Sequence, residues 1–358
     1  MPQLDKLFEL MIREKASDLH VATGRPPVIR IHGELRRLDT APLTSEQNHA
    51  MCTELMNERA KAEFAARNQV DFVYALGSTA RFRSNVFQER QGVSGAFRLI
   101  PSKISTAQEL NLPEAITNLC RLKKGLVLVT GPTGSGKSTT LAAMIDTCNQ
   151  TRKDHIITVE DPIEFVHPDK NCLVRQRQLH ENVGSFSDAL RAALREDPDI
   201  VLLGEMRDLE TISLAITAAE TGHLVFGTLH TSSAAKTVDR VIDAFPTSQQ
   251  EQIRTILSES LRGVVAQILL RRCDVKGRVA AFEILLGVPA LSNLIREGKT
   301  FQINSLIQTH GNAGMRSMDQ SLAELVKQRK VNPSEAFEYA SDKKAFQAAV
   351  HGANAPAM

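Results

Sequence analysis

LVLVTGPTGSGKSTT, residues 126–140, is the stretch that decides the fold. Its first four residues form an apolar run with the length of a buried parallel strand. Residues 131–138 then match G-x-x-x-x-G-K-[ST], the pattern of a phosphate-binding P-loop, and a helix is expected from Thr139 onward. A Gly-rich turn can match this pattern by chance, but here a strand precedes the loop and a helix follows it. The sequence therefore predicts that the protein binds ATP or GTP.

The residue types in this stretch suit a triphosphate. Glycines let backbone N–H groups close around the phosphates, Lys137 supplies a point charge to the β and γ oxygens, and the Ser138 hydroxyl can ligate Mg²⁺. The N-terminus of the following helix also favours an anion. The predicted nucleotide-binding residues are Gly131, Pro132, Thr133, Gly134, Ser135, Gly136, Lys137, Ser138 and Thr139.

From residue 125 onward, short apolar runs alternate with expected helices. The runs are 126–129, 156–159, 200–203 and 224–228, and the helices are 138–148, 186–196, 209–221 and 233–243. This alternation predicts an α/β fold with a mostly parallel sheet. Ligands bind such sheets at the carboxyl ends of the strands, so the residues that follow each run are the candidates for chemistry.

Carboxylates follow the second and third runs, and a histidine follows the fourth. Glu160 and Glu205 are the candidates for the two acidic roles of phosphoryl transfer, one near Mg²⁺ and one that orients or deprotonates water. Which of the two fills which role is left open. Each candidate has a structural alternative, because a strand-end carboxylate often only caps a loop or helix, as Asp208 would before the 209–221 helix. A lone His230 would more often be structural, but its position beside a P-loop favours a catalytic role.

The first hundred residues predict a small α+β domain with an antiparallel sheet. Residues 3–15 show helical periodicity, and Thr44 with Gln47 forms a capping-box pattern that opens a helical stretch to about Arg67. The candidate strands are 18–22, 28–32, a return strand from 35, and 71–76, 81–89 and 93–100. Alternation in the fifth places Arg81 and Arg83 on one face, and Arg98 lies on the next strand. On local pattern alone, a solvated sheet face explains these arginines equally well.

Prolines at both ends mark residues 101–113, PSKISTAQELNLP, as a linker between domains at 1–100 and 114–358. Beyond the fourth run, residues 247–262 are expected to be helical, whereas periodicity cannot assign 264–270 and 279–286 to sheet or buried helix. A C-terminal helical region follows at about 289–351. Its expected helices are 290–297, 300–309, 318–329, 333–340 and 342–350.

Composition narrows the class of protein. Lys and Arg number 43 and Asp and Glu 41, which argues against a dedicated nucleic-acid or membrane-surface binder, and the absence of Trp with only two Tyr removes an aromatic platform for bases. Five scattered cysteines without a C-x-x-C pair form no disulfide or zinc framework and indicate a reducing compartment. No apolar run approaches the ~18–20 residues of a membrane span. We expect a cytoplasmic protein.

Four segments, in order, resemble the Walker A, Asp, Walker B and His boxes of the type II/IV secretion and pilus ATPases. They are GPTGSGKSTT at 131–140, HIITVEDPIEFVH at 155–167, DPDIVLLGEMRDLET at 197–211 and TGHLVFGTLHTSSA at 221–234. Residues 16–20, ASDLH, and 81–83, RFR, resemble the family's N-terminal domain. Within the family, the chain is most similar to the type IV pilus retraction ATPases of twitching motility and their accessory paralogues.

The resemblance implies an architecture, cofactors and roles. The architecture is a hexameric ring whose subunits pair a PAS-like N-terminal domain with a RecA-like ATPase domain, with ATP and Mg²⁺ between them. Carried over residue by residue, the resemblance implies that Lys137 binds phosphate, that Ser138 binds phosphate and the metal ion, and that Glu205 is the Walker B acid and a second metal ligand candidate. Glu160 would head the Asp box, and His230 would sense the γ-phosphate. The resemblance also implies that three arginines reach the nucleotide, namely Arg81, Arg83 and Arg98. The implied partners are further copies of the chain, an inner-membrane pilus platform protein and a paralogous pilus ATPase, with attachment to the inner membrane only through this machinery.

Two features bear on the subtype. Extension and secretion ATPases often carry a four-cysteine zinc motif in the C-terminal domain, where this chain has only Cys273, so the retraction type is favoured. The retraction signature usually reads AIRNLIR, whereas residues 290–296 read ALSNLIR. This departure keeps an accessory motor, or a nucleotide-gated adaptor that supports another motor, as alternatives. A nucleic-acid translocase is a further alternative, which the balanced charge and the few aromatic residues disfavour.

Overall fold

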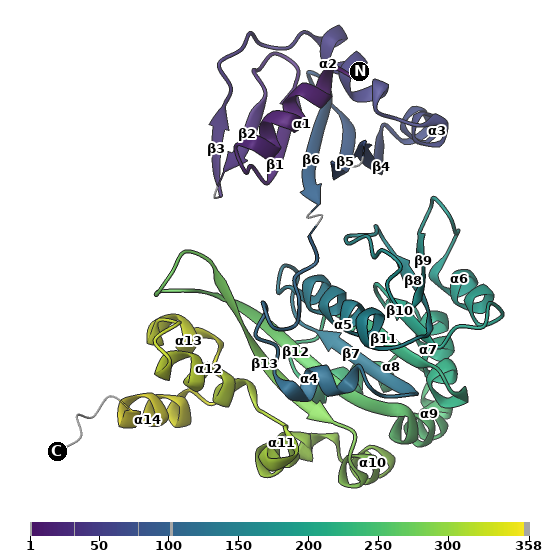
Figure 1. The fold of residues 1–358 in the computed structure, drawn as a ribbon, viewed down its shortest axis with the longest axis vertical. Coiled ribbons are helices and arrows are strands. Elements are labelled where there is room, and N and C mark those ends of the chain that lie inside the picture. Colours follow the sequence, from purple (N-terminus) through teal and green to yellow (C-terminus); the bar gives the residue numbers. More distant parts are fainter. Residues whose placement is uncertain (1, 32, 78, 101–102, 354–358) are drawn as a thin grey trace. The chain divides into compact units, whose positions relative to one another are not determined.

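The computed structural model describes residues 2–31, 33–77, 79–100 and 103–353, which divide into two compact units at 1–103 and 104–358 (Figure 1). Of the residues expected to form the linker, Pro101 and Ser102 lie outside the described part, and 103–113 contain no helix or strand. His32, expected at the end of a strand, is also outside it. Each unit has a sheet and a hydrophobic core of its own.

The smaller unit is built on an antiparallel sheet, as its sequence predicts, and its six strands lie in the order β3-β2-β1-β6-β5-β4. The strands are β1 (Asp18–Ala22), β2 (Val28–Ile31), β3 (Glu34–Arg37), β4 (Gln69–Leu76), β5 (Ala80–Glu89) and β6 (Gly92–Ile100). Helix α1 (Gln3–Arg13) packs Phe8 onto the sheet, where its ring stacks on Phe82 at 4.1 Å and meets Phe97 edge-on. This aromatic group anchors the core of the unit.

The helical stretch predicted from Thr44 to Arg67 is two helices, α2 (Ser45–Glu54) and α3 (Glu58–Arg67). The capping box of Thr44 and Gln47 at the start of α2 is confirmed. The break arises because the side chain of Asn57 accepts a hydrogen bond from the N–H of Ala60 and so caps a new helix. Local side-chain capping therefore overrides the continuity that the helix-forming residues suggested.

The larger unit contains a seven-stranded sheet in the order β13-β12-β7-β11-β10-β8-β9. The strands are β7 (Gly125–Thr130), β8 (His155–Glu160), β9 (Leu173–Gln178), β10 (Ile200–Leu203), β11 (Leu224–Leu229), β12 (Leu261–Arg271) and β13 (Arg278–Leu286). All neighbours pair in parallel except β12 and β13, which confirms the predicted mostly parallel sheet. The P-loop strand β7 lies between β12 and β11, so both of its edges are hydrogen-bonded within the sheet.

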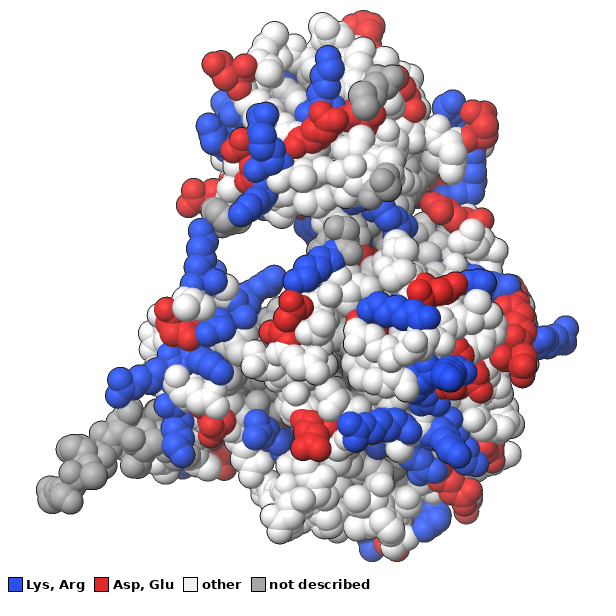
Figure 2. All heavy atoms as spheres, in the orientation of Figure 1, with Lys and Arg blue, Asp and Glu red and all other residues white. Residues whose placement is uncertain are grey.

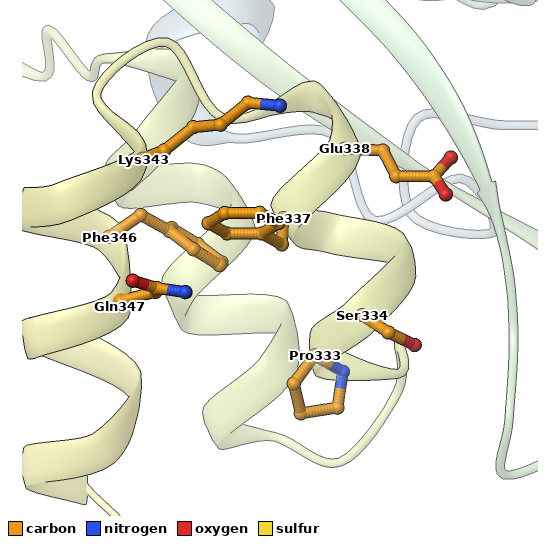
Figure 3. Close-up of a pocket in the computed structure, with 7 residues that line it drawn as sticks. All are labelled: Pro333, Ser334, Phe337, Glu338, Lys343, Phe346 and Gln347. Atoms are coloured by element: carbon orange, nitrogen blue, oxygen red, sulfur yellow. The ribbon is translucent and has the colours of Figure 1, made fainter.

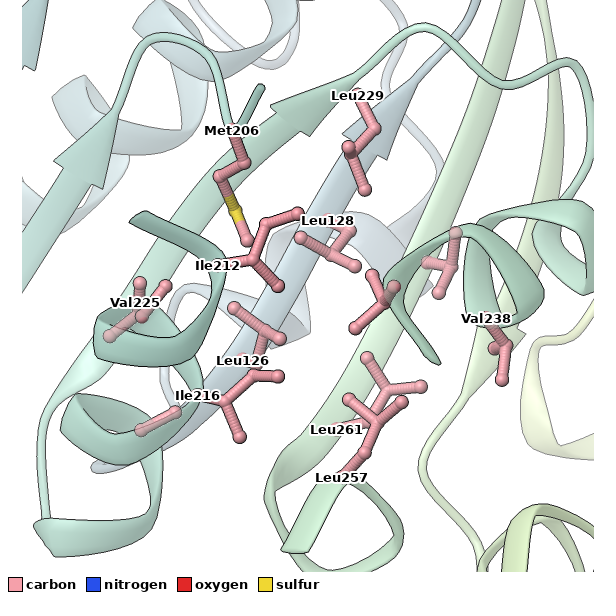
Figure 4. Close-up of a cluster of buried hydrophobic side chains, with 14 of the residues drawn as sticks. Leu126, Leu128, Met206, Ile212, Ile216, Val225, Leu229, Val238, Leu257 and Leu261 are labelled. Atoms are coloured by element: carbon pink, nitrogen blue, oxygen red, sulfur yellow. The ribbon is translucent and has the colours of Figure 1, made fainter. Parts of the chain in front are cut away.

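Alternate residues of β7 enter separate hydrophobic clusters on the two faces of the sheet. Val127 and Val129 pack with α4 (Glu114–Leu119) and α5 (Lys137–Thr151). Leu126 and Leu128 pack on the other face with α7 (Leu209–Thr221), α8 (Ala234–Asp243) and α9 (Thr247–Ser260) (Figure 4). Burying each such side chain stabilises the fold by roughly 1.5–3 kcal/mol. This packing fixes the end of β7, from which the P-loop departs.

The sequence left two parts of this sheet undefined. The undecided segments 264–270 and 279–286 are the antiparallel pair β12 and β13. Strand β9 was not predicted, because LVRQRQ is too polar to read as a buried run, although its alternate residues Val174 and Gln178 are buried. It is the edge strand beside β8, where one face and one edge remain accessible to solvent.

The remaining helices are shorter than predicted at several ends. Helix α6 (Phe186–Ala193) precedes β10, and the C-terminal region follows β13. Its elements are α10 (Pro289–Arg296), a 3₁₀ turn η1 (Thr300–Gln302), α11 (Ile303–Thr309), a second 3₁₀ turn η2 (Gly311–Ala313), α12 (Met318–Lys327), α13 (Pro333–Tyr339) and α14 (Lys343–Ala353). Helices α10 and α11 join the large core, whereas α12, α13 and α14 pack with Ile268 and Leu270 of β12. No helix of the described residues is long and apolar enough to cross a membrane.

Candidate nucleotide-binding site

The P-loop leaves the buried end of β7 and closes onto the start of α5. Gly131 and Gly136 have φ angles of +143° and +88°, which residues with a Cβ rarely adopt. A Cβ at Gly131 would also lie 2.2 Å from the carbonyl oxygen of Gln267, and one at Gly136 would lie 2.8 Å from the Gln267 Nε2 atom. Backbone conformation and close approach therefore both require glycine at these two positions.

Gln267, on β12, holds the loop in this shape. Its side chain is buried, its Nε2 donates to the Ser135 carbonyl oxygen at 2.6 Å, and its Oε1 accepts from Thr140 Oγ1 at 2.7 Å. One amide thus joins the P-loop to the first turn of α5. Sequence reasoning missed this residue, because a single Gln inside an apolar run gives no indication of its partner more than a hundred positions earlier.

The loop has the features of an anion site. The Lys137 ammonium is nearly buried and donates to the carbonyl oxygens of Gly131 at 2.9 Å and Pro132 at 3.1 Å. Burial lowers the pKa of Lys137, and the negative charges of Glu205 and Glu164 only partly offset this. The buried Ser135 hydroxyl has no hydrogen-bond partner among the described residues, and no side chain caps α5 or places an acid in its first turn. A phosphate would satisfy these groups, so the residues present fit a nucleotide.

Glu205 and His230 are brought together at the ends of β10 and β11. The His230 Nε2 atom donates to one Glu205 carboxylate oxygen at 2.9 Å, and the Arg207 guanidinium contacts the other oxygen at 2.6 Å. These residues line a cavity of about 180 Å³ with Met206, Leu229, Thr231 and Arg240. The two strand-end residues predicted from separate boxes therefore form one polar cluster.

The cluster keeps Glu205 ionised. Burial by itself would raise the pKa of Glu205, but the Arg207 guanidinium and the His230 imidazole outweigh burial and hold the pKa below its usual value. The negative charge of Glu205 reaches Lys137 and partly offsets the lowering of the Lys137 pKa by burial. A carboxylate that stays charged near the P-loop can serve as a metal ligand or as an acceptor for water.

Glu160 is placed differently. It ends β8 and is partly buried, and its Oε1 accepts hydrogen bonds from Thr158 Oγ1 at 2.6 Å and from Gln176 Nε2 at 3.1 Å. Burial raises the pKa of Glu160 in spite of these two hydrogen bonds. Glu160 does not line the Glu205 cavity, although its backbone lies against Gly204, which immediately precedes Glu205.

Asp208 caps a helix, which the sequence allowed as an alternative to a catalytic role. It caps α7, accepting hydrogen bonds from the N–H of Thr211 at 2.8 Å and from its hydroxyl at 2.7 Å. It therefore helps fix the segment after β10 without facing the cavity.

The three candidate arginines, Arg81, Arg83 and Arg98, lie on one face of the sheet of the smaller unit. Arg83 pairs across the strands with Arg98, and Arg81 lies two residues from Arg83, so the predicted alternation in β5 is confirmed. Arg98 forms an ion pair with Asp18 at 2.8 Å, whereas Arg83 is exposed and has no hydrogen bond or ion pair among the described residues. Arg98 is therefore held in place by β1, and Arg83 is available for another group.

A larger cavity, of about 480 Å³, lies between α13 and α14 and contains none of the candidate site residues (Figure 3). Its walls include Pro333, Phe337 and Phe346, and Lys343 lies over the Phe337 ring at 5.0 Å. This cavity is the larger of the two, but the groups suited to binding phosphate lie in the P-loop and the Glu205 cluster. Among the described residues there is no cluster of three or more His, Cys, Asp or Glu side chains arranged to hold a metal ion.

Fold and site together define a P-loop α/β protein, and comparison with known proteins identifies its family. The family model of type II/IV secretion system proteins matches residues 1–338. The type IV pilus retraction ATPase PilT of Pseudomonas aeruginosa is 51% identical over 337 residues, which cover 94% of this chain and 98% of PilT. The type IV pilus ATPase PilU of the same organism is 37% identical over 338 residues, covering 94% of this chain and 88% of PilU.

A solved structure agrees with these matches along the chain. The crystal structure of the pilus retraction motor PilT with bound ADP has a TM-score of 0.90 and 46% identity, covering 96% of this chain and 99% of that one. The chain belongs to the type II/IV secretion system protein family.

Proposed function

We propose that this chain is an ATP-hydrolysing motor that drives type IV pilus retraction. The observation that carries the proposal is the P-loop at the end of β7 with the Glu205–His230 pair at the ends of the neighbouring strands, in a chain 51% identical to a pilus retraction ATPase. Retraction would remove pilin subunits from the base of the fibre and so produce twitching motility. ATP hydrolysis supplies the work.

The proposed roles follow from the contacts at the site. Residues 131–139 hold the phosphates, Lys137 neutralises the β and γ oxygens, and Mg²⁺ is held by the Ser138 hydroxyl and Glu205. When bound, Mg²⁺ would neutralise charge on the transferring phosphoryl group. His230 reports the γ-phosphate through its hydrogen bond to Glu205. Glu160, whose carboxylate is oriented by Thr158 and Gln176, is the second acid, and the division of work between Glu160 and Glu205 stays open.

The proposed assembly is a homohexamer. The antiparallel sheet of residues 1–100 would be a PAS-like domain, residues 101–113 a linker, and residues 114–358 a RecA-like ATPase domain with a C-terminal helical region from about 289 to 351. The candidate arginines Arg81, Arg83 and Arg98 would reach the nucleotide. The ring would turn an inner-membrane platform protein from the cytoplasmic side, and its place at the membrane would depend on that partner.

One segment supports an accessory motor as the second candidate. In ALSNLIR, the first departure from the retraction signature is Leu291, which is buried in the large core and substitutes for isoleucine with little change of volume. The second is Ser292, whose hydroxyl donates to the Ser258 carbonyl oxygen at 2.6 Å where the signature has an arginine. The chain thus has no cation at position 292 of α10, a helix that the resemblance links to retraction rather than to ATP turnover.

A surface pilus count tests the proposal. We expect a strain that lacks this gene, and a strain that carries Glu205→Ala, both to display many more pili than the wild type and to lose twitching. Pilus extension would continue in these strains while retraction stops. Electron microscopy of surface pili and a stab-agar motility assay provide the two readouts.

Near-normal pilus numbers, with motility lost only under load, would reject the main retraction motor and favour the accessory role. A nucleotide-gated adaptor would instead appear as folded, nucleotide-bound hexamers with negligible hydrolysis. ATPase stimulation by single-stranded DNA that falls steeply with salt would favour a translocase. Such a track needs continuous basic surface, whereas Figure 2 shows acidic and basic side chains interspersed over the visible face of the larger unit.

The arginines of the smaller unit give a further prediction. If Arg83 acts as an arginine finger, Arg83→Ala should lower kcat for ATP by ~10³-fold or more, because a transition-state charge loses its partner. Arg81→Ala should also lower the rate. Arg37→Ala, on the exposed edge strand β3, is the matched control and should leave the rate unchanged. Steady-state turnover at saturating ATP decides the matter, and unchanged rates in both Arg81 and Arg83 variants would remove these residues from the site.

A further inference from the structure

Glu283 is a buried carboxylate to which the proposed reaction assigns no role. It lies on β13 with 6% of its surface exposed, and no lysine, arginine or histidine of the described chain forms an ion pair with it. A carboxylate without a cationic partner is costly to bury. An apolar side chain could be buried at this position at a lower cost in free energy. The presence of a carboxylate here therefore suggests that its acceptor oxygens have a function.

The first residues of two different helices lie near the Glu283 carboxylate. Its Oε1 accepts a hydrogen bond from the N–H of Ala234, where α8 begins, at 2.7 Å. The N–H of Met318, where α12 begins, also acts on the carboxylate and opposes the rise in its pKa. Helix N-termini carry partial positive charge, so two of them compensate the buried anion in place of a cation. Burial raises the pKa of Glu283, and the two N–H donors oppose that rise.

The start of α8, which Glu283 contacts, is also connected to the nucleotide site. Thr237, in the first turn of α8, is fully buried, and its hydroxyl lies 2.7 Å from that of Thr231, which follows His230 and lines the same cavity. The same hydroxyl lies 3.4 Å from that of Thr130, the last residue before the P-loop. A change at His230 or at the P-loop therefore acts on a helix whose first N–H is held by Glu283.

The start of α12 is held by hydrogen bonds to β13. Ile284, beside Glu283, exchanges backbone hydrogen bonds with Arg316 at 2.8 and 3.1 Å, and the N–H of Phe282 donates to the buried Ser321 hydroxyl at 3.0 Å. Helix α12 then packs with α13 and α14 in a cluster separate from the core around the P-loop. Any shift of α8 relative to β13 would therefore change the support of this helical group.

We infer that Glu283 is a positioning residue that fixes the His-box end of α8 against the first turn of α12, so that nucleotide turnover at His230 is transmitted to the C-terminal helices. This inference rests on the proposed ATPase function and adds a route by which the reaction reaches a distant part of the chain. The groups that Glu283 contacts on the two helices are backbone N–H groups, which a substitution cannot remove without disturbing the backbone. The carboxylate of Glu283 is therefore the group that substitution can remove cleanly.

Glu283→Gln tests the inference in the full-length protein. The amide has nearly the same shape, but it can accept from one N–H only and presents its own NH₂ group to the other. We expect kcat for ATP to fall by about 2- to 30-fold, the usual scale of coupling between linked sites, with little change in KM because the P-loop is untouched. Glu324→Gln, on the solvent side of α12 with a hydrogen bond only to Gln328, is the matched control and should behave as wild type.

Hydrogen exchange separates transmission from simple support. In the wild type, ADP with Mg²⁺ should slow amide exchange in both α5 and α12. In Glu283→Gln, the slowing in α5 should persist and the slowing in α12 should be lost. If Glu283→Gln fails to fold, Ala234→Pro removes the same hydrogen bond from the other side, since proline is accepted at the first position of a helix after an extended residue such as Ser233.

Three results would overturn the inference. The first is a wild-type protein in which ADP slows exchange in α5 but not in α12. The second is a folded variant whose α12 response and kcat equal those of the wild type. The third is a wild type without any ADP response in α5, which would overturn the proposed ATPase function together with the inference built on it and is thereby distinct from the first two.

Discussion

Lys137→Ala is expected to lower kcat for ATP by at least about 10²–10³-fold, the cost of removing one preorganised charge partner from a developing anion. The Lys137 ammonium is held by the carbonyl oxygens of Gly131 and Pro132, so it needs no reorganisation when a phosphate arrives. Alanine leaves those carbonyl oxygens facing the phosphates without a cation between them. Nucleotide affinity should also fall, which a titration with a fluorescent ADP analogue measures beside steady-state turnover.

The fold should survive this substitution, because Lys137 contributes no apolar packing to the cores on either face of the sheet. Thermal unfolding of Lys137→Ala should therefore remain close to that of the wild type. Lys124→Ala, an exposed lysine immediately before β7, is the matched control and should retain full turnover. Turnover within a few-fold of wild type in a folded Lys137→Ala protein would show that phosphate is bound elsewhere.

Glu205→Ala is expected to lower kcat by about 10²–10⁴-fold, the usual contribution of a positioned acid or base, while nucleotide binding is retained. The carboxylate is the common partner of Arg207 and His230, so its removal leaves both side chains without the group that orients them. The P-loop contacts of Lys137 and Gln267 do not involve it. The difference from Lys137→Ala is thus a selective loss of rate, read from the same pair of assays.

Glu210→Ala provides the control for Glu205→Ala. Glu210 lies in the first turn of α7, pairs with the exposed Arg191 and does not line the cavity, so its loss should leave turnover unchanged. Normal hydrolysis by Glu205→Ala would exclude this residue as the essential acid and direct attention to Glu160. Loss of nucleotide binding together with rate would indicate that Glu205 acts through ground-state binding of the metal.

The sequence predicted the P-loop and the parallel strands because each relies on local patterns. Glycine at Gly131 and Gly136 reports a backbone conformation, and buried runs such as 126–129 report a strand covered on both faces. Strand ends then converge by topology, which is why Glu205 and His230 could be expected near each other before their 2.9 Å contact was seen.

The remainder depended on partners distant in the chain. Gln267 and Glu283 are polar residues inside β12 and β13, and their value lies in contacts with Ser135 and Ala234, which no local pattern announces. The same two strands could not be told from helices, because burial on both faces erases their alternation. At Glu160 the pattern located a carboxylate but not its orientation, which Gln176 of the unpredicted strand β9 sets.

The hold of Gln267 on the P-loop also bears on how the chain matures. The glycine-rich segment leaves the ribosome long before β12 does, and until β12 pairs with β7 nothing occupies the position of the Gln267 amide. A nascent chain that ends before β12 would carry every Walker A residue and still lack the clamp that shapes them. Because such long-range pairing forms slowly, nucleotide binding should be a late event of synthesis, acquired only after most of the polypeptide has emerged.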